Sequence, residues 1–464
     1  MAGPVPGYAG CMTTTPLVEL SDRLSAQVPR YTSYPTAPHF HPGVASATYR
    51  EWLSALPADA GISLYLHIPY CDRLCWFCAC NTRQTRQYGP VTRYLAALHK
   101  EIDTVAGLVG RSVKVRSVHF GGGSPTMLLP ADIVALDRRL RQAFNYAADA
   151  EISVEIEPND MDEARFEALA AIGMTRVSLG VQDFDPKVQA AINREQSFEL
   201  TRSAVEGARS RGARSVNLDL VYGLPHQTVA SVESTVRQAL QLEPDRIALF
   251  GYAHVPWFKK HQTMIDETWL PDANARFAQS TRAGEVIVAG GYEAIGLDHF
   301  AKPGDSLAVA MRSGRMHRNF QGYTDDDGDV LVGLGASSIG RLPQGYVQNN
   351  TATGEYERLV GESGLAAARG FAFSDEDLAR GWVIERLMCD FAFSPAELAR
   401  LFPAHAPGIL ADARRLVAND RGAVFTEERD RFVVTPEGRP LVRTVAAGFD
   451  TFLRTGKARH SAAV

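Results

Sequence analysis

Residues 62–82 read ISLYLHIPYCDRLCWFCACNT, an apolar run typical of a β-strand that leads directly into a cysteine-rich loop. The loop holds four of the chain's six cysteines, Cys71, Cys75, Cys78 and Cys80, in the spacing C-x3-C-x2-C-x-C. Thiolates bind zinc and iron–sulfur clusters. A structural zinc site usually draws on two separated pairs of ligands, whereas these cysteines share one short loop. The spacing therefore favours three corners of a [4Fe–4S] cluster whose fourth iron is open, with zinc as the alternative.

Length and composition describe an ordinary globular protein. The chain has 464 residues, of which 45% are hydrophobic and 22% charged, enough for two domains that include a barrel. Its net charge of −5 argues against nucleic acid as the main partner. No apolar run approaches the ~20 residues that span a bilayer, and the N-terminal MAGPVPGYAGC lacks the regions of a signal peptide. We expect a cytoplasmic protein without membrane contact, in which Cys11 is a surface thiol and disulfides are not favoured.

From residue 61 onward, short apolar segments alternate with amphipathic ones. The amphipathic stretches, at about 90–109, 131–144, 161–171, 197–211, 227–241 and 272–289, predict helices. Six strand–helix units predict an α/β fold with a parallel sheet and right-handed crossovers. A partial barrel is favoured over a doubly wound sheet, because the cysteine loop stands where a G-x-G-x-x-G turn would follow the first strand. The predicted strands are 62–68, 115–120, 151–157, 176–182, 215–221 and 246–252, followed by a short strand near 292–297 and a helix near 305–314.

Several of the predicted strands carry polar residues on one face. Side chains two or four residues apart in a strand point the same way, and polar groups inside a parallel sheet are costly unless a partner satisfies them. The lumen of a complete eight-stranded barrel is packed with apolar residues instead. We therefore expect an incomplete barrel whose lumen admits polar ligands. The pairs are Tyr65 with His67, Glu155 with Glu157, Ser178 with Gln182, and Asn217 with Asp219.

Changes of pattern along the chain divide it into three regions. Residues 1–60 form an N-terminal arm, in which 28–42, VPRYTSYPTAPHFHP, is too rich in proline for a helix or a central strand. Residues 61–355 hold the partial barrel and its C-terminal extension. Residues 356–464 are mostly helical with a late hairpin, which predicts a small winged-helix-like domain. Its helices carry charges of both signs, so covering the open side of the barrel is favoured over binding DNA.

The first strand and its loop resemble the radical S-adenosylmethionine (SAM) superfamily, where C-x3-C-x2-C holds a [4Fe–4S] cluster and the open iron binds the methionine moiety of SAM. The resemblance implies a (β/α)6 barrel and makes Cys71, Cys75 and Cys78 the cluster ligands. Gly121-Gly122-Gly123-Ser124 follows the second strand and resembles the glycine motif that holds the methionine amino group. Gly122, Gly123 and Ser124 carry that role over, although the family more often has Thr where Ser124 stands.

Longer motifs narrow the resemblance to the oxygen-independent coproporphyrinogen III oxidases. They are YLHIPYCDRLCWFCACN around the cysteines, RYTSYPTA in the arm and HRNFQGYTD at 317–325. In that family the cysteine that follows the first three, here Cys80, does not bind the cluster. The resemblance implies that a SAM-derived 5′-deoxyadenosyl radical takes a hydrogen from the β-carbon of a propionate, after which CO2 and one electron leave and a vinyl group remains. Two propionates of coproporphyrinogen III are processed in this way, giving protoporphyrinogen IX for haem biosynthesis.

The same resemblance assigns the remaining site residues. Tyr65 and Glu155 would contact the first SAM, and Phe320 and Gln321 would lie near the reacting centre; these four are the candidate catalytic residues. Phe77 would meet the adenine through its backbone, and Ile339 would line the same pocket. A second SAM molecule would be held by Gln182, Arg194, Asp219 and Ala253.

Partners are less well defined by the sequence. The cations Arg315, His317 and Arg318 are expected to face the propionates of the substrate. The electron donor and acceptor are not identified, and we expect a monomer. The alternative function is that of a haem chaperone of the same superfamily without oxidase activity. Such proteins typically have an aromatic residue where Cys80 stands and lack RYTSYPTA and HRNFQGYT, so the oxidase is favoured.

Overall fold

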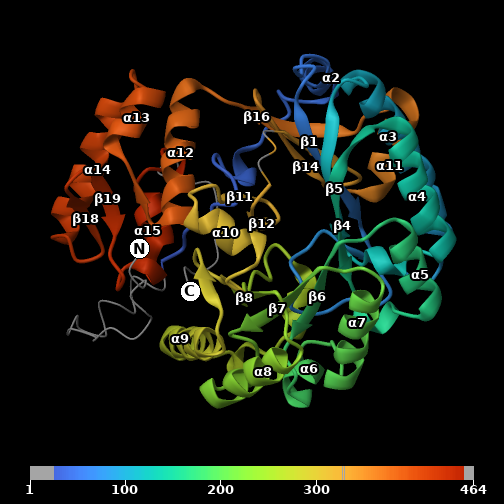
Figure 1. Ribbon diagram of the computed structural model, residues 1–464, viewed down its shortest axis with the longest axis horizontal. Helices are drawn as coiled ribbons and strands as arrows, with labels where there is room; N and C mark the ends of the chain where they lie inside the picture. The colour runs from blue at the N-terminus through green and yellow to red at the C-terminus, as the bar shows by residue number, and fades with distance from the viewer. Residues whose placement is uncertain (1–25, 327, 329, 454–464) are drawn as a thin grey trace.

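The computed structural model describes residues 26–326, 328 and 330–453. Six parallel strands form the centre of its main sheet and are neighbours in the order in which they follow along the chain. Helices connect them along the outer face (Figure 1). This arrangement confirms the predicted α/β partial barrel. The strands are β1 (Gly61–Ile68), β4 (Lys114–Gly122), β5 (Asn145–Ile156), β6 (Arg176–Gln182), β7 (Ser215–Tyr222) and β8 (Arg246–Gly251).

The outer helices form where the apolar residues recur at helical spacing. Helix α7 buries Thr201, Ala204, Val205 and Ala208, the i, i+3, i+4, i+7 pattern of a single apolar stripe. Its first turn is capped by Ser197, whose hydroxyl accepts from the N–H of Leu200 at 3.1 Å. The helices around the sheet are α3 (Gly89–Val109), α4 (Pro130–Ala143), α5 (Glu163–Ala171), α6 (Pro186–Ala191), α7 (Phe198–Ser210), α8 (Val229–Gln241) and α9 (Ala273–Ala289).

The sheet continues beyond the six strands on both sides. Strand β13 (Val330–Leu334) pairs in parallel with β1, and β14 (Ile339–Leu342), β15 (Gly345–Asn349) and β16 (Ala367–Ala372) follow as antiparallel strands. At the other side β10 (His299–Ala301) and β9 (Glu293–Ile295) are added to β8. The twelve-stranded sheet thus ends at β16 and β9. Shorter elements near it are β2 (Tyr70–Cys71), β3 (Arg83–Gln84), α10 (Ser306–Arg312), β11 (His317–Asn319), β12 (Gly322–Thr324) and α11 (Thr353–Ser363).

The C-terminal unit begins later than the expected boundary at residue 355, because α11 packs on α3 and β16 belongs to the barrel sheet. From α12 onward the chain has a hydrophobic core of its own, which contains Leu387, Phe393 and Phe432. A three-stranded sheet packs with the helices, as expected for a winged-helix-like unit. Its elements are α12 (Asp375–Asp390), β17 (Ala392–Phe393), α13 (Pro395–Leu401), α14 (Ala406–Asp420), β18 (Phe425–Glu428), β19 (Arg431–Val434) and α15 (Val442–Ala447).

The N-terminal arm joins this unit to the barrel (Figure 1). Tyr31 and Tyr34 are buried in the core of the C-terminal unit, and the Tyr31 hydroxyl donates to Asp450 at 3.1 Å. Further along, His41 bridges to Gly370 of β16, and α2 (Ser46–Ser54) packs on α3. The arm is therefore part of both cores. The predicted surface thiol Cys11 lies outside the described residues. Across those residues, no helix is both long and apolar enough to cross a membrane.

Candidate active site

The lumen of the partial barrel is a cavity of about 1060 Å3. Six residues of the four predicted polar pairs line it: Tyr65 and His67 from β1, Glu155 from β5, Ser178 from β6, and Asn217 and Asp219 from β7. Glu157 and Gln182 do not line it. Buried apolar residues of the same strands, such as Leu64, Val154 and Leu218, alternate with them and belong to the main core. The sequence therefore placed the lumen correctly, and the lumen is large enough for ligands of substantial size.

The cysteine loop fits the three-ligand part of an iron–sulfur cluster. Cys71, Cys75 and Cys78 are all partly buried and free of disulfides, and each sulfur has a hydrogen-bonding neighbour. The Cys71 sulfur lies 3.0 Å from the hydroxyl of Thr82, Arg194 Nη1 donates to the Cys75 sulfur at 3.6 Å, and the Cys80 N–H donates to the Cys78 sulfur at 3.4 Å. Hydrogen bonds to sulfur stabilise thiolates and tune the potential of such clusters. Within the described ranges, no three His, Cys, Asp or Glu side chains are grouped as a single metal ion would require.

Cys80 differs from the other three cysteines of the loop. It is exposed and lines the lumen, and the three expected ligands do not line it. A hydrogen bond with Cys80 is the main reason that the pKa of the Cys78 thiol falls to about 7, and the same bond raises the pKa of Cys80. The thiol of Cys78 is thus easier to ionise than that of Cys80, whereas burial raises the pKa of Cys71 and of Cys75.

A segment after β8 holds the cysteine loop in place. His261 Nε2 lies 2.7 Å from the carbonyl oxygen of Cys78, Gln262 donates to that of Phe77 at 2.9 Å, and Lys259 donates to that of Cys80 at 2.9 Å. No sequence pattern indicates these three residues, because their partners are backbone atoms about 180 positions away. They orient the loop without contacting its thiols.

Tyr65 and Glu155 are connected through His119 in the lumen wall. The Tyr65 hydroxyl lies 3.1 Å from His67 Nδ1, and its ring stacks on His119. Glu155 accepts from His119 Nε2 at 3.2 Å and from the Gly122 N–H at 3.0 Å. Burial alone would raise the pKa of Glu155, but these contacts outweigh it and lower the pKa. Glu155 is therefore an anion in the lumen at neutral pH, and His119 is a site residue that the sequence did not reveal.

The glycine loop shapes the mouth of the lumen. Gly122 has a φ of +115° and lines the lumen, and a β-carbon there would meet the His67 ring at 2.7 Å. A β-carbon at Gly123 would meet the Tyr70 carbonyl oxygen at 2.6 Å. Only glycine fits at both positions. Ser124 is buried and turns away: its hydroxyl donates to Asp160 at 2.5 Å and its N–H to the Tyr70 carbonyl. The serine thus anchors the loop that carries the cysteines instead of lining the lumen.

The residues predicted for a second SAM do not lie together in one wall. Asp219 lines the lumen, but Arg194 and Gln182 do not. The Arg194 guanidinium pairs with Glu157 at 2.6 Å and donates to the Gly180 carbonyl at 2.6 Å. Ala253 and Phe77 are brought together, since Gln262 donates to the carbonyl oxygens of both. Ile339 lines the lumen from β14.

The late motif HRNFQGYTD contributes only part of its residues to the lumen. Phe320 and Gln321 line it as expected, and Phe320 packs edge-on against Tyr346. The cations expected to face the substrate lie elsewhere: His317 contacts Glu385 at 3.2 Å, Arg315 is exposed, and the Arg318 side chain is 4% exposed beside Asp298. Strands β11 and β12 pair in antiparallel fashion, so the chain reverses its direction between Arg318 and Tyr323. The two ends of the motif therefore face different cavities.

Other cations take their place in the lumen. Arg176 pairs with Glu151 at 2.8 Å and Arg246 with Asp305 at 2.7 Å. Arg369 of β16 also lines the lumen, and it donates to the side-chain oxygen of Gln348 at 2.7 Å. Among the described residues, no carboxylate forms an ion pair with Arg369. The sequence did not reveal Arg369, because its strand β16 is connected to the parallel strands through three successive antiparallel pairings.

Comparison with known proteins gives matches over nearly the whole chain. The model of the radical SAM superfamily matches residues 65–239. An oxygen-independent coproporphyrinogen III oxidase of Bradyrhizobium diazoefficiens is 49% identical over 438 residues, which cover 94% of this chain and 97% of the relative. The corresponding protein of Escherichia coli is 40% identical over 429 residues, covering 92% and 93%.

A solved structure agrees with these matches. The coproporphyrinogen III oxidase of Escherichia coli, described as a radical SAM enzyme, superposes with a TM-score of 0.87 at 37% identity. The alignment covers 92% of this chain and all of that one. The resemblance therefore extends well beyond the residues that the superfamily model matches.

Proposed function

This chain belongs to the oxygen-independent coproporphyrinogen III oxidases of the radical SAM superfamily, and from that membership we propose how its lumen serves the reaction. It is an oxidoreductase of haem biosynthesis that converts coproporphyrinogen III to protoporphyrinogen IX by oxidative decarboxylation of two propionates. The observation that carries the assignment to this lumen is the position of the cysteine loop, which contributes Ala79, Cys80 and Asn81 to the lining of a polar cavity of about 1060 Å3.

The cofactors follow from the family: a [4Fe–4S] cluster and SAM. When bound, they supply the radical that removes hydrogen from the β-carbon of a propionate, before CO2 and one electron leave. We propose Cys71, Cys75 and Cys78 as the cluster ligands. The backbone of Gly122, the ring of Tyr65 and the carboxylate of Glu155 would bind and orient SAM beside them. The apolar ring of Phe320 would shield the reacting carbon from water, and Gln321 would contact the substrate.

A second SAM molecule is part of the proposal. Arg194 donates to the Cys75 sulfur and lies with Gln182 beside Gly180. The carbonyl oxygens of Phe77 and Ala253 share the Gln262 donor, and Asp219 lines the lumen. Titration of the reconstituted enzyme with an uncleavable SAM analogue should give two molecules per chain. A stoichiometry of one would remove this part of the proposal and leave the first SAM site intact.

We propose Arg369 as a cation that grips a propionate. Backbone pairing aligns Tyr65 with Gly333, Ile339 with Gln348, and Gln348 with Arg369, so Arg369 stands on the lumen side of the extension that carries Ile339. Its only described side-chain partner is the neutral Gln348, and burial lowers its pKa. A carboxylate of the substrate would supply the missing charge, in a hydrogen bond that guanidinium and carboxylate both favour.

Substitution of Arg369 tests this role. Arg369→Gln should raise KM for coproporphyrinogen III by about 10- to 100-fold, the cost of a charged hydrogen bond, and leave SAM affinity unchanged. Arg369→Lys should recover part of the loss, and Arg358→Gln, on the exposed face of α11, should behave as the wild type. Equal losses of SAM and substrate affinity would mean that Arg369 supports the fold of the lumen instead.

The activity itself is tested by anaerobic incubation of the reconstituted enzyme with SAM, a reductant and coproporphyrinogen III. Release of CO2 and formation of protoporphyrinogen IX are expected. Tight binding of haem without CO2 release would contradict the oxidase function and favour the chaperone. Iron and sulfide analysis of the same preparation should find a cluster, and zinc alone would contradict the ligand assignment.

Location and partners complete the proposal. We propose a cytoplasmic monomer that takes electrons from, and returns them to, carriers still to be identified, with neither nucleic acid nor membrane as a partner. The net charge of −5 supports the exclusion of nucleic acid. Size-exclusion chromatography with light scattering should give a mass near 50.6 kDa, and a dimer mass would contradict the monomer.

A further inference from the structure

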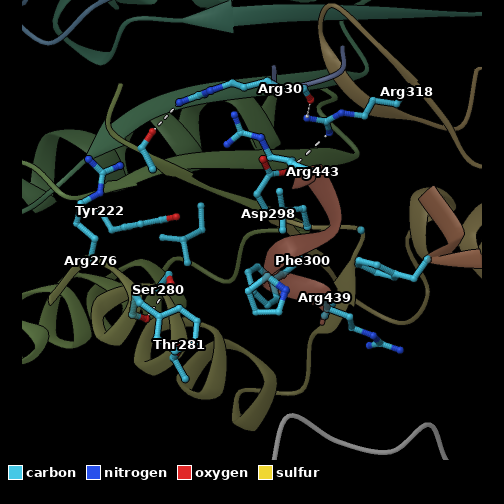
Figure 2. Close-up of a pocket in the computed structure, with 18 residues that line it drawn as sticks. Arg30, Tyr222, Arg276, Ser280, Thr281, Asp298, Phe300, Arg318, Arg439 and Arg443 are labelled. Atoms are coloured by element: carbon cyan, nitrogen blue, oxygen red, sulfur yellow. Dashed lines mark hydrogen bonds and ion pairs between the residues drawn. The ribbon is translucent and has the colours of Figure 1, made fainter. Parts of the chain in front are cut away.

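A second cavity, of about 100 Å3, lies between the barrel and the C-terminal unit, and we call it the arginine cavity. It shares no lining residue with the lumen. Five arginines line it, whereas among the described residues that line it Asp298 is the one carboxylate. The arginines are Arg30 from the arm, Arg276 from α9, Arg318 from β11, and Arg439 and Arg443 from the C-terminal unit (Figure 2).

Asp298 compensates only part of this charge. Its Oδ1 accepts from His299 Nδ1 at 2.7 Å and lies 3.9 Å from Arg318 Nη1. The Nε and Nη1 atoms of Arg318 are buried and have no hydrogen-bond partner. The Arg318 side chain as a whole is 4% exposed. A buried guanidinium with unsatisfied donors is costly unless an anion is near.

Arg30 and Arg276 have capacity left for a ligand. Arg30 Nη2 donates to the Gly251 carbonyl at 2.8 Å, and Arg276 Nη2 donates to the Tyr252 carbonyl at 2.8 Å. These are the only side-chain hydrogen bonds of the two residues within the described part of the chain. Figure 2 shows Arg30 and Arg318 on one side of Asp298, with Arg276 beside Tyr222 on another. Neutral carbonyl oxygens satisfy the donors without supplying a counter-charge.

The pKa values of three of the five arginines agree with this shortage of negative charge, whereas Tyr323 and Asp298 outweigh burial and raise the pKa of Arg318. Burial lowers the pKa of Arg30 and of Arg276. Burial, followed by repulsion from Arg30, lowers the pKa of Arg443 to about 10. Arg443 also donates to the backbone carbonyls of Val28 and Pro29. The shortage of negative charge therefore concerns Arg30, Arg276 and Arg318.

We propose that the arginine cavity binds a small multivalent oxyanion of the phosphate class. Guanidinium groups bind phosphate oxygens through paired hydrogen bonds, and three of them converge here from separate elements. The volume of about 100 Å3 corresponds to roughly three water molecules. That space suits a single tetrahedral anion and is too small for a nucleotide or a tetrapyrrole.

The bound anion would connect three parts of the molecule. Arg30 belongs to the arm, Arg276 to the barrel, and Arg439 and Arg443 lie in the C-terminal unit. An anion that binds only this assembled arrangement stabilises it against unfolding. The site would therefore couple the docking of the arm to the supply of phosphate, separately from the reaction in the lumen.

The test uses the full-length, reconstituted enzyme in a chloride buffer free of phosphate and sulfate. Inorganic phosphate, added at constant ionic strength, should raise the unfolding temperature in a saturable way, by about 3 °C at 100 times Kd. Isothermal titration calorimetry should give one site per chain. Arg276→Gln should weaken phosphate binding about tenfold or more. Arg237→Gln, an exposed arginine of α8 paired with Glu233, should leave it unchanged.

Four results would overturn the proposal: a non-saturable rise, an equal rise with added chloride, unchanged affinity in Arg276→Gln, or displacement of phosphate by coproporphyrinogen III. The last would place the cavity within the substrate site. If Arg276→Gln fails to fold, crystals of the wild-type enzyme soaked in tungstate give an independent answer. An anomalous peak among Arg30, Arg276 and Arg318 supports the proposal, and its absence there overturns it.

Discussion

The lumen and the arginine cavity lie on two sides of His299 and shift the pKa of a buried carboxylate in opposite directions. His299 lines the lumen, and its neighbour Asp298 lines the arginine cavity. In the lumen, Asp219 faces Asn217, Ser178 and the anionic Glu155, and burial raises its pKa to about 6. Burial would also raise the pKa of Asp298, but His299, Arg318 and Arg30 outweigh it and lower the pKa well below its usual range.

The contrast shows that burial alone does not decide the charge state of a carboxylate in this fold. Neighbouring dipoles and ions decide it. The lumen tolerates a surplus of negative groups beside its cysteine loop, with Arg176 and Arg246 paired to acids of their own. The arginine cavity has a surplus of positive groups that no described lining residue cancels. The part of the lumen around Glu155 is suited to cationic groups such as the sulfonium and amine of SAM, and its Arg369 side to a carboxylate. The arginine cavity is suited to an anion.

The largest expected effect comes from the cysteine loop. Cys71→Ser, Cys75→Ser or Cys78→Ser should each abolish the cluster and all CO2 release, because each removes one ligand. Cys80→Ser should keep the iron content of the wild type. Iron analysis and the absorbance near 400 nm measure the outcome. Loss of iron in Cys80→Ser would show that the ligands are assigned wrongly.

The same variants sharpen the comparison between the two cavities. Because the arginine cavity shares no lining residue with the lumen, the apo protein of Cys75→Ser should keep the phosphate-dependent rise in unfolding temperature. Loss of that rise together with the cluster would mean that the two regions are one coupled site.

Glu155→Gln should lower kcat/KM by about 100-fold or more, the effect of removing one charged contact in a preorganised site. The amide keeps the shape but loses the negative charge that His119 and Gly122 support. The cluster content should be unchanged, since Glu155 contacts none of the three thiols. Activity within tenfold of the wild type would remove Glu155 from the site.

Asp298→Asn should lower the free energy of unfolding at pH 7 by about 2–3 kcal/mol, because it leaves the arginines without their carboxylate. The pKa of Asp298 is lowered in the folded state, so its contribution is fully present above about pH 4 and is lost as the pH falls further. Chemical denaturation at pH 7, 5 and 3.5 should show a deficit that shrinks only at the lowest pH. Phosphate should stabilise Asp298→Asn more than it stabilises the wild type, because it replaces the lost charge. A smaller stabilisation than in the wild type would mean that phosphate needs Asp298 to shape the cavity.

Asp219→Asn should have the smallest effect on the free energy of unfolding, and its sign should be opposite to that of Asp298→Asn. The pKa of Asp219 is raised to about 6, so the folded state holds its proton more tightly than the unfolded state, and stability falls as the pH rises from about 4 through 6. The asparagine variant escapes this loss and should be more stable at pH 7 by about 1–2 kcal/mol. The gain should vanish near pH 4. If Asp219→Asn were less stable than the wild type at pH 7, the contrast drawn between the lumen and the arginine cavity would be wrong.

Much of the barrel could be predicted from the sequence, because its signals are local. The strand predicted at 62–68 is β1 at Gly61–Ile68, and the helix predicted at 197–211 is α7 at Phe198–Ser210. Strand β5 begins six residues before its predicted start, at Asn145, where Asn145 and Tyr146 of the segment NYAADA pair with Lys114 and Val115 of β4. Its residues have weak strand propensity, and the neighbouring strand overrides it.

A C-terminal extension of the barrel was expected, but its strands β13–β16, which supply Arg369 and complete one side of the lumen, were not predicted. Its strands have four to six residues and contain Gly333, Gly340, Gly345 and Gly370. Short strands interrupted by glycine give no clear alternation. Their pairing depends on contacts with β1, which lies more than 260 residues away in the chain.

The sequence by itself determined the chemistry of this protein: three thiols on one loop, a flexible glycine turn after the next strand, and polar side chains at alternate strand positions. Spacing along a loop or a strand fixes these relations, because the backbone geometry there is local. The tertiary structure alone decided that Ser124 contacts Asp160 and that Arg318 lies outside the lumen. It also decided that the arginines at positions 30, 276, 318, 439 and 443 line one cavity with Asp298. These arrangements depend on how the arm and the C-terminal unit dock on the barrel, and no local pattern encodes the distance between residues 30 and 443.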